Sequence, residues 1–151
     1  MRRSECEITD RAEIEEIIRR ASICRLALSD NAIPYIVPVC FGYEHGTLYF
    51  HCATEGRKLE ILKRNNRVCF EMDIETKLVV AEKACGWGMK YRCVIGSGTA
   101  SVVQDTAEKR KGLDAIMRQY SGPEGGYSRE VLSRTAVVKV AIESLTGKQA
   151  V

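Results

Sequence analysis

The chain has 151 residues, of which 45% are hydrophobic and 28% are charged, and its formal net charge is +3. This length and composition predict one globular domain, residues 1–151, and argue against intrinsic disorder. The positive charge is small and no basic run concentrates it. It therefore does not indicate a nucleic-acid-binding or membrane-binding protein, although it suits a small anionic ligand.

The N-terminus and the cysteines both predict a cytoplasmic protein. No apolar run approaches the length of a membrane span, and acidic residues follow residues 1–3 where a signal peptide would have its apolar core. The seven cysteines show no C-x-x-C pair and no Cys/His spacing typical of a zinc or iron–sulfur site. Five lie in apolar, strand-like runs, where we expect reduced thiols packed as small hydrophobic side chains: Cys24, Cys40, Cys52, Cys69 and Cys93.

The first predicted element is an amphipathic helix that begins after Asp10. Asp10 is a typical N-cap residue, and Glu13 follows at the spacing of a capping box. Apolar residues then recur at the helical positions i, i+3, i+4 and i+7, namely Ile14, Ile17, Ile18 and Ala21. Residues 23–29 predict a first strand, which turns at Asp30-Asn31.

The stretch 34–52 predicts a β-hairpin. Glu44-His45-Gly46 has turn chemistry and separates two runs that are rich in β-branched and aromatic residues. Pro38 lies inside the first of these strands and cannot donate a hydrogen bond to a neighbouring strand. We therefore expect either an edge strand or bulge at Pro38, or a ligand lying where the neighbouring strand is missing.

The stretch 53–62 changes from strand to helix and predicts an anion site. Small and hydroxyl residues lead into a helix whose first turn carries Arg57 and Lys58. Free N–H groups, the positive end of the helix dipole and two cationic side chains all favour a phosphate at such a helix start.

The rest of the chain predicts three strands and one helix. Gly96 and Gly98 lie within the longest strand and indicate a bend or the close approach of another backbone. The segment 77–89 has no clear pattern, and its Trp87 is interpreted either as a plug over the edge of the core or as an aromatic wall for a planar ligand or a partner. The predicted strands are 68–75, 91–103 and 135–143, the helix is 106–120 after Asp105, and 146–149 is expected to be a polar tail.

Five to seven strands joined partly by short turns, with two or three helices, favour an antiparallel barrel over a doubly wound sheet. A dinucleotide-binding glycine fingerprint is absent from the sequence, because Gly96-Ser97-Gly98 lies inside a predicted strand and not at a strand-to-helix turn.

Three motifs occur in a recognisable order: residues 34–39, the block 49–53 followed by Gly56-Arg57-Lys58-Leu59, and residues 87–92 followed by 94–98. In this order they resemble the pyridoxamine-5′-phosphate-oxidase-like split-barrel family, and in particular its 5-nitroimidazole-resistance branch. The resemblance covers nearly the whole chain. It implies a mainly β (α+β) fold, a six-stranded antiparallel split β-barrel with flanking helices, which forms a homodimer with two FMN molecules at the subunit interface.

The resemblance also implies which residues bind the FMN. By position, Arg57, Lys58 and the Thr54 hydroxyl would hold its phosphate. The strand residues Val37, Pro38, Val39 and Cys40 would run beside the isoalloxazine, His51 and Ala53 would line the same pocket, and Trp87 and Tyr91 would come from the neighbouring subunit.

The function that the resemblance implies is an FMN-dependent oxidoreductase. It would take electrons from a nicotinamide or other donor and pass them to a small planar acceptor such as a nitro-heterocycle. His51 is interpreted either as the catalytic proton donor or as a strand histidine satisfied by a neighbour.

Two other functions are weighed beside the oxidoreductase. One is a non-catalytic storage or sensor protein that holds FMN, haem or a deazaflavin. The other, a nucleic-acid-binding barrel, is disfavoured because basic residues are interleaved with acidic ones. Vitamin B6 oxidation is not expected, because the C-terminal Trp-Arg-Leu-type motif of true pyridoxamine-phosphate oxidases is missing from residues 144–148.

Overall fold

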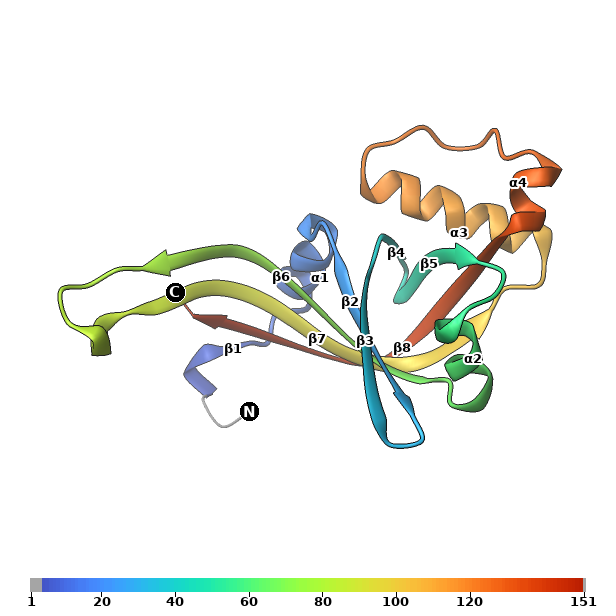
Figure 1. The fold of residues 1–151 in the computed structure, drawn as a ribbon. Helices are drawn as coiled ribbons and strands as arrows, with labels where there is room; N and C mark the ends of the chain where they lie inside the picture. The colour runs from blue at the N-terminus through green and yellow to red at the C-terminus, as the bar shows by residue number, and fades with distance from the viewer. Residues whose placement is uncertain (1–3, 151) are drawn as a thin grey trace.

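Antiparallel strands form the body of the protein, and helices lie around them (Figure 1). This computed structural model describes residues 4–150; residue 151 and residues 1–3, which entered the prediction about a signal peptide, lie outside the described part. The elements in chain order are η1 (Ser4–Cys6), β1 (Glu7–Ile8), α1 (Arg11–Arg20), β2 (Cys24–Asp30), β3 (Ile33–Val39), β4 (Phe41–Glu44), β5 (Thr47–Ala53), α2 (Arg57–Arg64), β6 (Arg67–Val79), η2 (Ala84–Gly86), β7 (Gly88–Val102), α3 (Thr106–Gln119), α4 (Arg129–Arg134) and β8 (Thr135–Ala150).

The sheet closes into a barrel at the interruption between the consecutive strands β3 and β4. Its strand order is β3-β2-β6-β7-β8-β5-β4, with β1 paired to β8 beside this path. The two ends of the path, β3 and β4, are consecutive in sequence and separated only by Cys40. When β3 and β4 are counted as one interrupted strand, six strands surround the core, which confirms the predicted six-stranded antiparallel split barrel.

The barrel core follows from the alternation of side chains along the strands. Its fully buried members include Leu26, Phe41, Phe50, Phe70, Met72, Val94 and Val138. A second, smaller cluster lies outside the barrel, where α3 covers β4 and β5 (Figure 1). It contains Tyr49, Val103, Leu113, Ala115, Ile116, Leu132 and Val137.

Several local predictions are confirmed. Asp10 is the N-cap of α1 and accepts a hydrogen bond from the Ala12 N–H at 2.9 Å, and Asp105 caps α3 by accepting from the Glu108 N–H at 2.8 Å. His45 and Gly46 both have positive φ, 47° and 76°, in the two-residue turn between β4 and β5.

Of the two alternatives predicted at Gly96 and Gly98 in β7, a bend or the close approach of another backbone, the close approach is confirmed. The pairing of β7 with β8 shifts register between Ser97 and Gly98. A Cβ at Gly98 would lie 2.1 Å from the Ala141 carbonyl oxygen, so only glycine fits this close backbone approach.

The C-terminal predictions are partly wrong. Residues 146–149, expected as a polar tail, belong to β8, which runs from Thr135 to Ala150 and pairs with β7 and β1 on its two sides. Pairing on both sides supplies backbone partners that outweigh the low strand propensity of this polar segment. The helix α4 was not predicted, because its six residues are too short to show helical periodicity.

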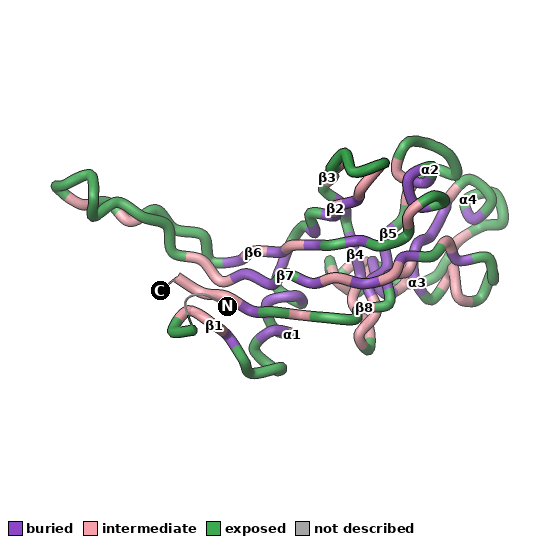
Figure 2. The backbone as a smooth tube through the Cα atoms, turned by 90° about the horizontal axis from the view of Figure 1, so that it is seen from below, coloured by how far each residue is buried: buried purple, intermediate pink, exposed green. Residues whose placement is uncertain are grey.

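The strands β6 and β7 continue past the barrel as a two-stranded extension, residues 77–90, which we call the arm (Figure 1). The segment 77–89, which has no clear pattern in the sequence, is β-strand at both ends, since Leu78 pairs with Met89 and Val79 with Gly88. The arm is mostly exposed (Figure 2). Trp87 is 51% exposed and donates its indole N–H to the Ala81 carbonyl within the arm at 2.7 Å, so it does not plug the core.

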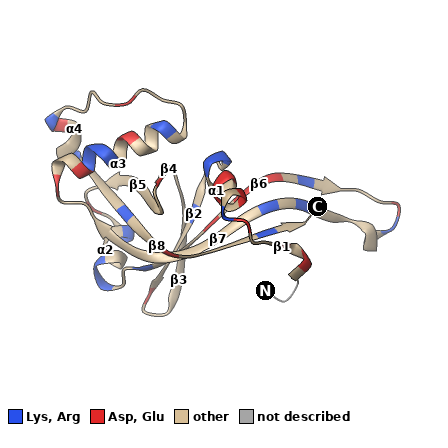
Figure 3. Ribbon diagram, turned by 180° about the vertical axis from the view of Figure 1, so that it is seen from behind, with Lys and Arg blue, Asp and Glu red and all other residues tan. Residues whose placement is uncertain are grey.

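The prediction that five cysteines are packed in the core is confirmed only in part. Cys24 and Cys93 are buried as expected and Cys52 is half-buried. Cys40, between β3 and β4, and Cys69, at an outward-facing position of β6, are exposed. Acidic and basic residues are interleaved over the surface (Figure 3). Among the described residues, no helix is long and apolar enough to cross a membrane.

Candidate functional site

The candidate site lies at the seam of the barrel, where β3 and β5 separate. β4 pairs with β5 from Glu44↔Thr47 to Phe41↔Phe50, whereas β3 pairs with β2 in the described part of the chain. The edge position predicted for Pro38 is therefore confirmed. Because β3 has no strand partner on this edge among residues 4–150, backbone groups at the edge can form hydrogen bonds with a ligand.

The hydroxyl of Tyr120, directly after α3, stabilises the interruption between β3 and β4. The Phe41 N–H donates to Tyr120 Oη at 3.1 Å, and Tyr120 Oη in turn donates to the Ser22 carbonyl at 3.1 Å. The rings of Phe41 and Tyr120 meet edge to face at 6.4 Å between centroids. Partial burial raises the pKa of the Tyr120 hydroxyl, which keeps it protonated and able to donate.

Gln119 fixes the same corner from the neighbouring position. Its side-chain Nε2 lies 3.0 Å from the Ile18 and Arg19 carbonyls and 3.1 Å from that of Ala21, which are carbonyls at the C-terminal end of α1. These carbonyls would otherwise lack partners at the helix end. The C-terminus of α3 thus ties α1 to the strand break at Cys40.

We expect Tyr120→Phe to lower the free energy of unfolding by about 1–3 kcal/mol, because two hydrogen bonds are lost while the ring remains. Tyr127→Phe is the matched control, because the Tyr127 hydroxyl is buried without a hydrogen-bond partner among residues 4–150. Removing an unpaired hydroxyl should change stability by less than about 0.5 kcal/mol or increase it. Urea denaturation of the variants measures both values, and equal stability of the two variants would contradict the role given to Tyr120.

The N-terminus of α2 brings two cations to the seam. Gly56 is the N-cap, with φ 127°, and no side chain among residues 4–150 caps the first turn. The Arg57 guanidinium lies 4.6 Å from the centre of the Tyr35 ring on β3, and Lys58 Nζ lies 5.2 Å from the centre of the Phe50 ring on β5. Within the described range, neither cation forms an ion pair with a carboxylate. The charge at this helix start is therefore available to an anion.

The predicted flavin residues fall on two sides of the barrel wall. Val39 is buried and Val37 is half-buried toward the core, whereas Pro38 and Cys40 are exposed on the outer surface. On β5, His51 and Ala53 are exposed as well, and Thr54 lies in the loop before α2. The structure therefore brings the outward-facing residues, Pro38, Cys40, His51 and Ala53, to the outer surface near the seam and the α2 start.

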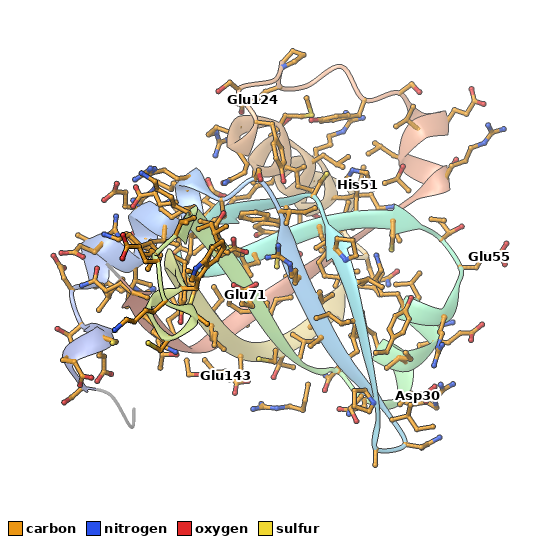
Figure 4. The ribbon with its side chains drawn as sticks, turned by 60° about the vertical axis from the view of Figure 1, so that its left-hand side comes forward. Asp30, His51, Glu55, Glu71, Glu124 and Glu143 are labelled. Atoms are coloured by element: carbon orange, nitrogen blue, oxygen red, sulfur yellow. The ribbon has the colours of Figure 1, made fainter. Side chains whose placement is uncertain are left out.

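His51 lies at a small pocket between β5 and α3 (Figure 4). The pocket has a volume of about 200 Å³ and mainly apolar walls: Leu113, Ile116, Met117, Tyr127, Val131 and Thr135. The Tyr127 hydroxyl itself is buried and has no hydrogen-bond partner among residues 4–150. Tyr120 and Tyr127 were both missed in the sequence, because the contacts that give them roles join segments far apart in the chain.

Trp87 and Tyr91 do not reach this site within one chain. The pairing β3–β2–β6–β7 places Ile36 at the level of Ser97, through Ala27 and Cys69. Tyr91 precedes Ser97 by six strand residues, which corresponds to about 20 Å. Trp87 precedes Tyr91 by four residues and lies within the arm, which extends away from α2 (Figure 1).

The comparisons with known proteins agree with the fold. A family model described as pyridoxamine 5′-phosphate oxidase matches residues 10–149. A structure from Bacteroides thetaiotaomicron, described as a candidate 5-nitroimidazole antibiotic resistance protein, is 38% identical with a TM-score of 0.85, over 95% of this chain and 86% of that one. No protein with a curated description matches.

Two more distant structures share the fold. The flavocytochrome Anf3 from Azotobacter vinelandii is 20% identical with a TM-score of 0.84, over 100% of this chain and 72% of that one. An FAD and haem binding protein from Mycobacterium smegmatis is 22% identical with a TM-score of 0.83, over 95% of this chain and 73% of that one.

Proposed function

The chain belongs to the pyridoxamine 5′-phosphate oxidase family, and we propose that it is an FMN-dependent oxidoreductase that reduces a small planar acceptor. The observation that carries the proposal is the pair of cations without carboxylate partners, Arg57 and Lys58, at the uncapped start of α2. The names of the similar structures, which include a nitroimidazole resistance protein and a flavin-binding protein, support the same reading.

The residues at the seam fit a flavin. The backbone N–H groups of α2, the Thr54 hydroxyl and the two cations would hold the phosphate. Residues 37–40, the end of β3 and the following Cys40, would lie beside the ring system, whose polar rim would take the place of a neighbouring strand. When bound, FMN supplies the hydride and electron transfer chemistry.

His51 would act as the proton donor for the acceptor. It stands at the mouth of the apolar pocket, which is large enough for a single planar ring and excludes bulk water from one of its faces.

We expect His51→Asn to lower the turnover number about 100-fold while flavin content stays unchanged, because general acid catalysis typically contributes 10²–10⁴. His45→Asn is the matched control, since His45 lies in the β4–β5 turn with φ 47° and asparagine tolerates this conformation. Steady-state rates with a nitroimidazole, measured across pH, test the expectation. An unchanged rate and pH profile in His51→Asn would show that His51 is a structural strand histidine and not the proton donor.

We further propose that the functional unit is a homodimer, in which the arm of one copy supplies Trp87 and Tyr91 to the seam of the other. Two observations support this: these residues lie about 20 Å or more from their own seam, and large apolar side chains are exposed on both surfaces. These side chains are Ile33, Ile36, Leu78, Val80, Trp87, Met89 and Ile95.

The first experiment is the visible spectrum of the purified protein, followed by acid release and mass determination of the pigment. One FMN per chain is the expected result. A colourless protein that takes up no added FMN would overturn the proposal. A haem or deazaflavin spectrum would show that the protein binds that cofactor in place of FMN. Stopped-flow reoxidation no faster than that of free reduced flavin would favour the non-catalytic alternative. We also propose a cytoplasmic location, since all seven cysteines are free thiols.

A further inference from the structure

A second, larger pocket lies beside α2. Its volume is about 610 Å³, within the usual range for ligand sites, and it lies between α2, the end of β7, the start of β8 and α3. Its floor is apolar and buried, with Leu59, Leu62, Ala100, Val103 and Ala136 at 2–7% exposure. Its rim is polar and includes Asn66, Ser101, Gln104 and Thr135.

The charge of this pocket favours an anion. Two lysines, Lys63 and Lys109, line it, and its lining contains no aspartate or glutamate. Three other pockets with charged linings each contain at least one carboxylate, such as Glu15 and Glu44 in one and Asp73 and Glu75 in another. Lys109 Nζ donates to the Leu132 carbonyl at 2.8 Å, which fixes its ammonium group and leaves two N–H bonds for a ligand.

Two residues connect the pocket to the proposed flavin site. Thr54 lines it and also belongs to the predicted phosphate site at the start of α2. Thr135 lines both this pocket and the small pocket of His51. A ligand with a phosphate at the α2 start can therefore extend into the pocket without crossing the seam.

We propose that this pocket binds an adenosine diphosphate group. The apolar floor suits the face of an adenine, the Asn66 and Gln104 amides suit its hydrogen-bonding edge, and the two lysines suit the phosphates. The inference rests on the proposed function, because the group would belong either to a flavin dinucleotide or to the nicotinamide donor.

ADP itself is the first probe, titrated calorimetrically into the full-length chain. Ser101→Phe fills the exposed rim and should abolish ADP binding, and Lys63→Glu reverses one charge and should weaken it at least about tenfold. Arg129→Glu makes the same charge reversal on α4, outside the pocket, and should leave ADP binding unchanged. Thermal melts show whether each variant is folded. If Ser101→Phe does not fold, Lys63→Glu still tests the inference, because Lys63 is exposed and its replacement should not disturb the fold.

The two sources of the group are separated with the same variants. If the purified protein carries FAD and Ser101→Phe carries FMN, the pocket holds the adenosine half of the flavin. If both carry FMN and Ser101→Phe raises the KM for the nicotinamide donor, the pocket holds the donor. Absence of ADP binding at about 5 mM, or binding that none of the pocket variants changes, overturns the inference.

Failure of this inference can be told apart from failure of the proposed function. Normal FMN binding without ADP binding would refute the pocket assignment alone. ADP binding that Ser101→Phe abolishes, in a chain that takes up no flavin, would refute the flavin proposal alone.

Discussion

Replacing Arg57 and Lys58 together by alanine is expected to weaken FMN binding at least about 100-fold, because two charge-assisted contacts to the phosphate are each worth about 1.5–3 kcal/mol. Neither side chain belongs to the buried core, so the variant should fold with near-normal stability. Quenching of FMN fluorescence on titration with the flavin-free protein measures the dissociation constant.

Riboflavin provides the sharper comparison, since it has the same ring system without the phosphate. Its affinity should be nearly the same for the parent chain and for the double variant. Arg129→Ala with Arg134→Ala is the matched control, which removes two cations from the exposed helix α4. Full retention of FMN by the Arg57/Lys58 variant would refute the phosphate site, and an equal loss of riboflavin would show general damage to the seam.

The features that could be predicted from the sequence are those set by residues close together in the chain. Asp10 and Asp105 cap their helices through N–H groups two or three residues away, and the His45-Gly46 turn joins strands that pair directly. The positions of Arg57 and Lys58 could also be predicted from the sequence, because the start of a helix determines where the side chains of its first turn lie.

The features that could not be predicted depend on contacts between distant segments. The strand character of residues 146–149 comes from β7 and β1, and nothing in the local sequence records those partners. The roles of Gln119 and Tyr120 depend on carbonyls of α1 and the loop after it and on the Phe41 N–H. Motif order suggested which residues form the site, but only the fold separates Pro38 and His51, on the outer surface, from Val39 in the core.

The arm gives the second large expected effect. Leu78 and Met89 are opposite each other in the β6–β7 pairing and are 52% and 48% exposed. Replacing both by glutamate should convert a dimer into a monomer, because two like charges would enter an apolar contact and lose their hydration there. If Trp87 and Tyr91 complete the seam of the other copy, flavin content should fall with the dimer. Sedimentation velocity and the flavin absorbance of the same sample measure the two changes together.

The neighbouring cross-strand pair supplies the control. Lys77 and Lys90 lie one residue along each strand from Leu78 and Met89, and so on the opposite face of the arm. Lys77→Glu with Lys90→Glu puts the same two carboxylates on that face and should leave both dimer and flavin in place. A stable monomer that still holds flavin would refute the shared site. If the dimer persists in Leu78→Glu with Met89→Glu, the interface lies not on the arm but on the exposed face that carries Ile36 and Ile95.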